Sequence, residues 1–408
     1  MSSLGFPFKN SAFILDQLIS HGFEAYVVGG AVRDYLLGRP IHDIDVATSA
    51  HPADVVSLFK RTIPIGIEHG TVAVLSHGST YEVTTFRSET GYDDFRHPNH
   101  VAFVPSLEQD LMRRDFTINA LAMDRAGIII DLFGGQSDIK KQRIRTVGKA
   151  EERISEDPLR MMRGMRFASE LCFTLGQTEC EAFHQKAELL KNISVERINQ
   201  EMTRLLAGKG VANALILLFK TGCIHKLPML EHAGPVTNAN TPRYWILQSD
   251  EERWTAFLIS VGIDDVHAFA KAWKWSKNVR QSVLRLTALL KQRSKNEWTR
   301  EAVYFAGTND AKAADRVLAA LGTLHENDLA SCERQVEFLW NACPIHSRSE
   351  LTVTGNQFMS WSEFKPGPWL AEVIQDLERD IVNGRIENKL EVIRSWFKKW
   401  QITQKKQS

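Results

Sequence analysis

The short apolar stretch RPIHDIDVAT, residues 39–48, contains two aspartates, Asp43 and Asp45, that are separated by one residue. A strand predicted over residues 42–49 would point both side chains to the same side, because side chains alternate along a strand. Two carboxylates so close together stay ionised only beside a cation. Oxygen ligands of this kind suit Mg²⁺, with triphosphate oxygens completing its coordination, and two such ions can promote a phosphoryl displacement. Taken alone, the pair could equally be an exposed strand end.

The preceding stretch VVGGAVRD, residues 27–34, predicts a strand, a pair of glycines and the start of a helix. Gly29 and Gly30 would let the backbone approach a ligand closely, and the free N–H groups of a helix start favour an anion. Arg33, one turn into this helix, could reach a phosphate or ribose oxygen. The alternative is a tight turn that needs glycine. The stretch contains neither a P-loop nor a dinucleotide-binding motif.

A third carboxylate often completes a two-metal site, and Glu82 is the best candidate for it. This residue lies in YEVTTF, residues 81–86, on a strand that could lie beside the strand of the aspartates. An ordinary exposed strand glutamate is the alternative.

The elements that must position these residues form a small α/β pattern up to about residue 140. A helix is predicted over 11–22, a strand over 24–30, a helix over 31–40, a hairpin that turns at 77–79, and a polar loop over 87–100. A helix over 106–124 and a strand and turn over 127–135 follow. From about 145 to 340 the periodicity is helical throughout, and a last long helix is predicted over 370–384.

Length and composition limit the class of protein. With 408 residues, of which 43% are hydrophobic, the chain exceeds what one core usually holds, so two or more domains are expected. The 50 basic and 49 acidic residues leave the net charge uninformative about nucleic acid. Five scattered cysteines suggest buried thiols in a reducing compartment. Because the start lacks a signal sequence and no apolar run is long enough to cross a bilayer, we expect a soluble, cytoplasmic protein without a membrane partner.

Five motifs in order carry a specific resemblance. They are YVVGGAVRDYLLGRPIHDIDVATSA, RRDFTINALAMD, DLFGG, EDPLRMMRGMRF and SVERINQEMTRLL, which together extend from residue 26 to about residue 206. The chain resembles the class II tRNA nucleotidyltransferases, the CCA-adding enzymes, and the related bacterial poly(A) polymerases. The C-terminal stretch LTVTGNQFM is similar to the tail of the shorter bacterial CCA-adding enzymes.

The resemblance implies a fold class and a domain order. The expected fold is an α+β nucleotidyltransferase head, with a mixed sheet and flanking helices, followed by all-α neck, body and tail domains. The head would occupy residues 1–145, the nucleotide-selecting neck 146–210, the helical body 211–310, and the helical, tRNA-binding tail 311–408. DLFGG, residues 131–135, would be the hinge between head and neck.

The resemblance also implies the activity and the residues that perform it. The expected reaction adds C, C and A to the tRNA 3′ end from CTP and ATP, without a nucleic-acid template, with two Mg²⁺ ions and release of pyrophosphate. Asp43 and Asp45 would be the catalytic, metal-binding pair. The residues expected to bind the nucleotide are Gly30, Arg33, Arg114, Asp157, Arg160, Arg163 and Arg166, supported by Gly29, Arg113, Asp115, Asn119 and Glu156.

Base selection has a physical argument of its own. On a helix, Asp157 and Arg160 would be neighbours, three residues apart. Cytosine and adenine both show an amino donor beside an unprotonated ring nitrogen, so an aspartate can accept from the first while an arginine donates to the second. Guanine and uracil present the reverse order, and a buried mispaired group costs about 1–3 kcal/mol. A surface ion pair between the two residues is the alternative for this spacing.

The charge distribution favours an RNA partner. Nine basic and four acidic residues lie between Ile139 and Phe167, and seven basic and two acidic residues between Asn383 and Ser408. Basic patches on a near-neutral chain suit a protein that grips an RNA backbone, here the acceptor and T arm and the 3′ end of tRNA. A solvated charged helix end is the alternative for the tail. The oligomeric state, with a homodimer among the options, stays open.

The nearest alternatives are an A-adding or CC-adding partial enzyme and a poly(A) polymerase of the same family. CC-adding relatives typically lack a flexible loop between the two head motifs. The stretch 87–100 fills that position and carries Asp93, Asp94 and Arg96. Its presence favours complete CCA addition.

Overall fold

The computed structural model describes residues 6–76, 78–90, 100–104, 106–237, 239–362, 365 and 367–407. The chain divides into two compact units, Met1–Ala239 with Val261–Lys274, and Asn240–Ser260 with Trp275–Ser408. The first unit holds every strand of the described residues, together with helices. In the described part of the second unit the regular elements are helices.

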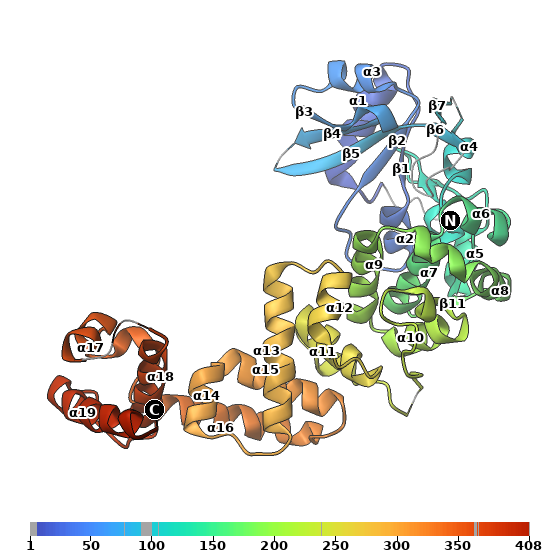
Figure 1. Ribbon diagram of the computed structural model, residues 1–408. Helices are drawn as coiled ribbons and strands as arrows, with labels where there is room; N and C mark the ends of the chain where they lie inside the picture. Colours follow the sequence, from blue (N-terminus) through green and yellow to red (C-terminus); the bar gives the residue numbers. More distant parts are fainter. Residues whose placement is uncertain are drawn as a thin grey trace. The chain divides into compact units, whose positions relative to one another are not determined.

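A seven-stranded mixed sheet forms the N-terminal part of the first unit (Figure 1), in the order β3-β4-β5-β2-β1-β8-β9. The strands are β1 (Ala25–Val28), β2 (Asp45–Thr48), β3 (Thr62–Gly66), β4 (Thr71–Ser76), β5 (Ser79–Thr85), β8 (Ala122–Met123) and β9 (Ile129–Ile130). β2 runs parallel to β5 and antiparallel to β1, so the predicted mixed sheet is confirmed. A separate antiparallel pair consists of β6 (Arg87–Thr90) and β7 (His100–Phe103).

Three helices flank this sheet: α1 (Ala12–Ser20), α2 (Gly30–Leu36) and α3 (Pro52–Leu58). α1 buries Ile14, Leu15 and Leu18, the apolar positions of its 3.6-residue period. The predicted helices near residues 11–22 and 31–40 are therefore confirmed. The predicted hairpin is also confirmed, since β4 and β5 pair up to Ser76 opposite Ser79.

The helix predicted over residues 106–124 is wrong beyond its first turns. α4 ends at Met112 after beginning at Leu107, and a short 3-10 turn (Thr117–Asn119) and then β8 follow. Ala122 pairs with Val28 of β1, so the end of this stretch is a strand of the sheet. Pairing with a distant strand overrides the local helical periodicity here, as tertiary context often does.

The strand predicted over residues 42–49 is shorter than expected. β2 begins at Asp45, and Asp43 lies in the irregular segment before it. The i, i+2 alternation within a strand therefore does not explain how the two aspartates come together.

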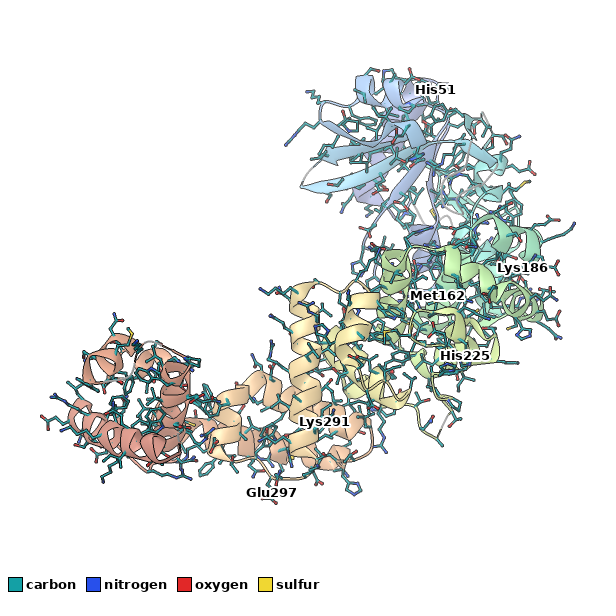
Figure 2. All side chains as sticks on the ribbon, in the orientation of Figure 1. His51, Met162, Lys186, His225, Lys291 and Glu297 are labelled. Carbon is teal, nitrogen blue, oxygen red and sulfur yellow. The ribbon has the colours of Figure 1, made fainter. Side chains whose placement is uncertain are left out.

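The remainder of the first unit packs around a buried helix, α7. Its helices are α5 (Gly135–Lys140), α6 (Ala150–Glu156), α7 (Leu159–Leu171), α8 (Gln177–Lys186), α9 (Val195–Ala207), α10 (Val211–Lys220) and α12 (Val266–Ala272), with a small parallel pair of β10 (Arg143–Ile144) and β11 (Thr174–Leu175). Met162 of α7, labelled in Figure 2, is fully buried. At Gly164 a Cβ atom would lie 3.0 Å from Phe183 and 3.2 Å from Phe116, so the two rings pack directly against the helix backbone.

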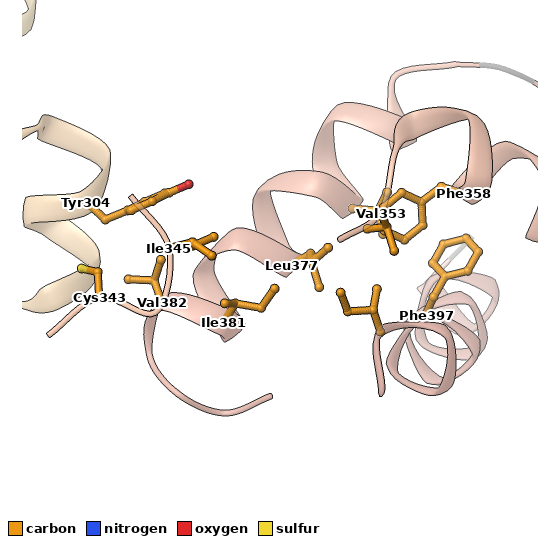
Figure 3. Close-up of a cluster of buried hydrophobic side chains, with 11 residues drawn as sticks. Tyr304, Cys343, Ile345, Val353, Phe358, Leu377, Ile381, Val382 and Phe397 are labelled. Carbon is orange, nitrogen blue, oxygen red and sulfur yellow. The ribbon is translucent and has the colours of Figure 1, made fainter. Parts of the chain in front are cut away.

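The second unit contains α11 (Asp250–Ser260), α13 (Lys277–Arg293), α14 (Arg300–Ala306), α15 (Thr308–Ala320), α16 (Leu329–Asn341), α17 (Gly355–Trp361), α18 (Trp369–Val382) and α19 (Leu390–Gln407). The expectation that the chain's last long helix lies over 370–384 is therefore wrong, since α19 follows it. Figure 3 shows the core that these last helices share, in which Phe358 of α17, Leu377 of α18 and Phe397 of α19 are fully buried. Aromatic side chains pack around Phe397 at centroid distances of 6.0 Å for Trp400 and 6.2 Å for Trp369.

All five cysteines are free thiols. Cys223, Cys332 and Cys343 are buried, but Cys172 is exposed and Cys180 is half-buried, so the expectation of buried thiols holds for three of the five. Among the described residues, no helix combines the length and the apolar content that crossing a membrane would require.

Candidate active site

One cavity of about 660 Å³ in the first unit gathers most of the residues selected from the sequence. Those that line it are Gly29, Gly30, Arg33, Asp43, Asp45, Arg113, Arg114, Asp115, Asn119, Asp157, Arg160, Arg163 and Arg166. They come from segments more than one hundred residues apart in the chain. Glu82 and Glu156 do not line the cavity.

The carboxylate pair lies at one side of this cavity. Asp45 is the first residue of β2 and pairs in register with Val28 of β1 on one side and with Glu82 of β5 on the other. Desolvation by the surrounding protein raises the pKa of the Asp45 carboxyl, and the negative charge of Glu82 raises it further. The positive charge of Arg114 acts in the opposite direction. Among the described residues, no group of three or more histidine, cysteine or acidic side chains is arranged to hold a metal ion. Asp43 and Asp45 both line the cavity, whereas Glu82 neighbours Asp45 in the sheet without lining it.

The glycine pair makes a turn that admits an arginine. Gly29 has a φ of +71°, and a Cβ atom at this position would lie 2.8 Å from Nη1 of Arg114. Arg114 donates from Nη2 to Asp110 (3.3 Å), whereas its buried Nε has no hydrogen-bond partner among the described residues. Burial lowers the pKa of Arg114. A buried guanidinium with an unused donor, beside a helix start, is suited to bind an anion.

A chain of hydrogen bonds links α2 to α7. Arg33 donates from Nη1 to the side-chain oxygen of Asn119 (2.6 Å), and Asn119 donates to Asp115 (3.0 Å). Arg163 donates to the other oxygen of Asp115 from both Nε (2.8 Å) and Nη2 (2.6 Å). Burial alone would raise the pKa of Asp115, but Arg163 and the hydrogen bond from Asn119 hold it well below its usual range. Asp115 therefore remains a carboxylate that orients two cavity residues at once.

The two residues proposed to read the base differ from the sequence-based prediction in one respect. Asp157 lies between α6 and α7 rather than on the helix of Arg160, and its carboxylate accepts from the backbone N–H of Leu159 (3.0 Å). Its carboxylate thus satisfies the free N–H group of the first residue of α7. The alternative of a surface ion pair is wrong, because Asp157 pairs with Arg197 (3.2 Å) while Arg160 pairs with Glu156 (2.9 Å).

Arg160 is buried and firmly held. Its side chain is only 7% exposed, and its Nη1 donates to Glu156 and to the carbonyl of Arg153 (2.8 Å). Its Nη2 donates to the carbonyl of Arg113 (3.3 Å). Glu156, which does not line the cavity, therefore supports a residue that does.

Arg166 is committed to the protein itself. It is 3% exposed and pairs with both Glu201 and Glu170, the second at 2.7 Å. Its guanidinium also stacks 4.0 Å from the ring centroid of Phe167. Burial lowers the pKa of Arg166. These contacts of Arg166 hold α7 in place where it lines the cavity.

Several lining residues were not selected from the sequence. They are Ala31, Asp34, His42, His69, Arg87, Phe167 and Arg204. Arg87 stands at the start of the polar stretch 87–100, and its basic charge there was the available signal. Its guanidinium donates to the main-chain carbonyl of His69. Asp93, Asp94 and Arg96 of the same stretch lie outside the described residues.

Family models match three parts of the chain. The model described as "Poly A polymerase head domain" matches residues 25–145. The model described as "Probable RNA and SrmB- binding site of polymerase A" matches residues 172–233, and the model described as "tRNA nucleotidyltransferase domain 2 putative" matches residues 246–397. Together with the mixed sheet and the cavity of carboxylates and arginines, these matches define a nucleotidyltransferase.

Individual relatives define the group more closely. A CCA-adding enzyme of Bacillus mycoides (strain KBAB4) is 42% identical over 396 residues, which cover 97% of this chain and 99% of the relative. A CCA-adding enzyme of Bacillus cytotoxicus is 43% identical over 397 residues, with the same coverage. The crystal structure of the Bacillus stearothermophilus CCA-adding enzyme in complex with CTP superimposes with a TM-score of 0.89 at 41% identity, covering 98% of this chain and 99% of that one. The chain belongs to the family of CCA-adding enzymes, which confirms the resemblance in its motifs.

Proposed function

We propose that this protein adds C, C and A to the 3′ end of tRNA, using CTP and ATP and no nucleic-acid template. The observation that carries the proposal is the single cavity that combines Asp43 and Asp45 with the glycine turn and with Asp157 and Arg160. Such a cavity has groups that can bind a metal-bound triphosphate and groups that can form hydrogen bonds with a base. The similarity to CCA-adding enzymes along 97% of the chain supports the same reaction.

The donor set of the cavity fits magnesium. Asp43 and Asp45 are hard oxygen ligands, and the pKa of Asp45 is raised by desolvation first and then by the negative charge of Glu82, which a cation would offset. We propose that these two aspartates hold Mg²⁺, with two ions expected, and that triphosphate oxygens and water provide the remaining ligands. Glu82 stays a weaker candidate, because it neighbours Asp45 without lining the cavity. Bound there, Mg²⁺ supplies charge neutralisation for the triphosphate and the leaving pyrophosphate.

The proposed chemistry is one displacement at phosphorus. The 3′-hydroxyl oxygen of the RNA forms a bond to the α-phosphorus of CTP or ATP, while the bond from that phosphorus to the α–β bridging oxygen breaks and pyrophosphate leaves. In this proposal Asp45 or a bridging metal ion would help to remove the proton of the hydroxyl. Gly30, Arg33 and Arg114 hold the triphosphate by backbone N–H groups and guanidinium charge.

Base selection rests on Asp157 and Arg160 in this proposal. Arg160 is held by Glu156 and two main-chain carbonyls, so its remaining N–H groups have a fixed direction. Asp157 is fixed by Leu159 and Arg197 and keeps lone pairs for the amino group of cytosine or adenine. A site built on such pairs discriminates strongly against a base that leaves them unmatched. Arg163 and Arg166 line the same cavity and shape its wall.

The partners and the wider organisation follow as proposals. We propose that the chain binds the acceptor and T arm of tRNA through its helical part, with the head, neck, body and tail at 1–145, 146–210, 211–310 and 311–408. The free thiols support the proposed location in the cytoplasm, a reducing compartment.

The deciding experiment supplies nucleotides singly to three tRNA transcripts, which end before the CCA sequence, after its first C and after its second C. We expect CTP to extend the first two, ATP to complete the third, and UTP and GTP to do neither. Labelling by ATP alone that runs on without limit would instead indicate a poly(A) polymerase, and extension of only some transcripts a partial enzyme. Arg160→Ala should relax the choice of base while turnover survives, and unchanged base choice would remove the assignment of Arg160.

A further inference from the structure

A second cavity, of about 670 Å³, adjoins the active-site cavity in the first unit. The two cavities share four lining residues, Arg33, Asp34, His42 and Arg204. The second one extends from this common wall to Arg39 and to Lys209. Ligands in the two cavities would therefore both contact these shared residues.

A tight turn pressed onto α7 presents Lys209. Gly208 and Gly210 flank this residue, and Gly210 donates its backbone N–H to the carbonyl of Ser169 (2.8 Å). A Cβ atom at Gly208 would lie 2.2 Å from Oγ of Ser169, and one at Gly210 would lie 2.9 Å from the carbonyl of Ala168. Both positions thus require glycine, and the exposed lysine between them is the residue that the turn offers to the cavity.

The acidic groups of this cavity are already neutralised. Each oxygen of the Glu170 carboxylate accepts from an arginine, Arg166 at 2.7 Å and Arg204 at 2.9 Å. Asp34 accepts from Arg33 through both of its oxygens, at 3.0 Å each.

Two exposed cations are left over. Arg39 donates from Nη1 to the main-chain carbonyl of Glu170 (2.9 Å), which fixes its guanidinium at the cavity and leaves its other N–H groups available. Lys209 forms no ion pair with any residue that the structure describes. The cavity therefore carries net positive charge, and its lining has no pair of free carboxylates that could seat a metal ion.

We propose that this second cavity, named here the strand pocket, binds phosphodiester groups of the RNA strand next to the 3′ end that is being extended. The inference rests on the proposed function, because that reaction brings a 3′-hydroxyl to Asp43 and Asp45 while the triphosphate occupies the glycine turn. The RNA strand that precedes this hydroxyl has to leave the active-site cavity. If it passes along the lining residues that the two cavities share, it reaches the free cations of Arg39 and Lys209. Arginine and lysine contacts to phosphates position a strand without reading its sequence, as a site serving many tRNAs requires.

The test compares Lys209→Ala, Arg39→Ala and the double variant with the wild type, using CTP and a tRNA transcript that ends before the CCA sequence. We expect each single change to raise KM for the RNA by about fivefold, as loss of one exposed charge contact does, and the double change to raise it further. The slope of log affinity against log salt should fall by about 0.7 for each phosphate contact removed from a single strand. KM for CTP at saturating RNA should stay unchanged.

Two controls separate the possible causes. Lys209→Arg should retain RNA affinity, and Lys60→Ala, which removes a lysine from a different cavity of the same unit, should leave both KM values unchanged. A rise in KM for CTP rather than for RNA, or no change in either with Lys209→Ala, would overturn the strand pocket. A wild type that binds the transcript but fails to extend it would instead overturn the proposed function.

Discussion

Arg153 donates a hydrogen bond from Nη2 to the main-chain carbonyl of Arg114, at 2.9 Å, and another to the carbonyl of Arg113. Arg153 does not line the active-site cavity. It nevertheless joins α6 to the segment that carries Arg114, which does line this cavity. Its Nη1 pairs with Glu156, the residue that holds Arg160. One side chain therefore positions both the proposed triphosphate contact and the proposed base contact.

Arg153→Met should accordingly raise KM for CTP and ATP and increase incorporation of UTP and GTP. We expect KM to change by about tenfold, the size of one lost hydrogen bond to a charged group. Single-nucleotide extension assays measure both effects, and Arg153→Lys should restore part of each. A variant with a lower Tm but normal KM and base choice would show that Arg153 stabilises the fold only.

Replacing Asp45 should separate catalysis from stability. Asp45→Asn should reduce nucleotide addition by about 10²–10⁴-fold, because the residue is the proposed proton acceptor and ion ligand. In EDTA at pH 7 the same variant should have a higher Tm than the wild type. The pKa of Asp45 is raised in the folded protein, so its ionised form destabilises the fold above that pKa, and the neutral amide removes this effect. Glu108→Asn, a change at an exposed acid outside the cavity, is the control. An unchanged Tm would contradict the charge crowding around Asp45.

The raised pKa also predicts that magnesium binding releases protons. As the pH falls toward the pKa of Asp45, a growing fraction of this carboxyl is protonated, and an incoming cation displaces the proton. Calorimetric titration of the protein with MgCl₂, in buffers of different ionisation enthalpy, should therefore show more proton release at acidic pH than at pH 8. Asp45→Asn should abolish the difference. Equal release at both pH values would argue that Asp45 is not an ion ligand.

Gly29→Ala should reduce activity more than a matched glycine substitution does. Gly29 and Gly22 both have positive φ, +71° and +85°, so alanine is strained at either position by about 1–2 kcal/mol. Only at Gly29 does the new Cβ meet Arg114, because nothing lies within 4 Å of a Cβ at Gly22. We expect similar losses of Tm but a fall in kcat/KM of about tenfold or more for Gly29→Ala alone. Equal activity of the two variants would show that the position of Arg114 is unimportant.

Asp115→Asn should weaken the link between Arg163 and Asn119. Breaking a buried ion pair leaves Arg163 partly uncompensated, and Glu201 at 3.7 Å makes up little of the loss, so we expect about 2–4 kcal/mol of destabilisation. The pKa of Asp115 is held low in the folded state, so its contribution to stability is present above the ordinary carboxyl pKa and is lost only in strongly acid solution. Urea unfolding at pH 7 and at pH 3 measures the difference between wild type and variant, which should be smaller at pH 3. A difference that grows on acidification would contradict the ion pair.

Much of the site could be predicted because its residues cluster in short motifs. Gly29, Arg33 and Asp45 lie within a stretch of seventeen residues. Their types alone suggest a glycine turn, an arginine that binds an anion and an aspartate that binds a cation. Arg87 was missed although it begins the polar stretch 87–100, and Phe167 was missed although it ends the motif EDPLRMMRGMRF, because only the fold brings their side chains to the cavity. Arg153 was likewise unmarked, because its role consists of hydrogen bonds to main-chain carbonyls, which leave no trace in sequence.

The fold was predicted where periodicity and local structure agree. α1 and the β4–β5 hairpin show their own apolar period and turn residues. The stretch after Met112 shows a helical period, but its Ala122 pairs with a strand almost one hundred residues earlier, which no local pattern encodes. Asp157 was expected on the helix of Arg160, whereas it lies between α6 and α7.

The tail's aromatic core has a consequence for how this protein can change over time. Phe358, Trp369, Phe397 and Trp400 pack together within the second unit, whereas the residues proposed to bind nucleotide belong to the first unit. Mutations on the outer faces of α17, α18 and α19 can therefore accumulate without disturbing transfer chemistry. In lineages whose tRNAs diverge in shape, the sequence of this end of the molecule could change while the catalytic residues stay the same.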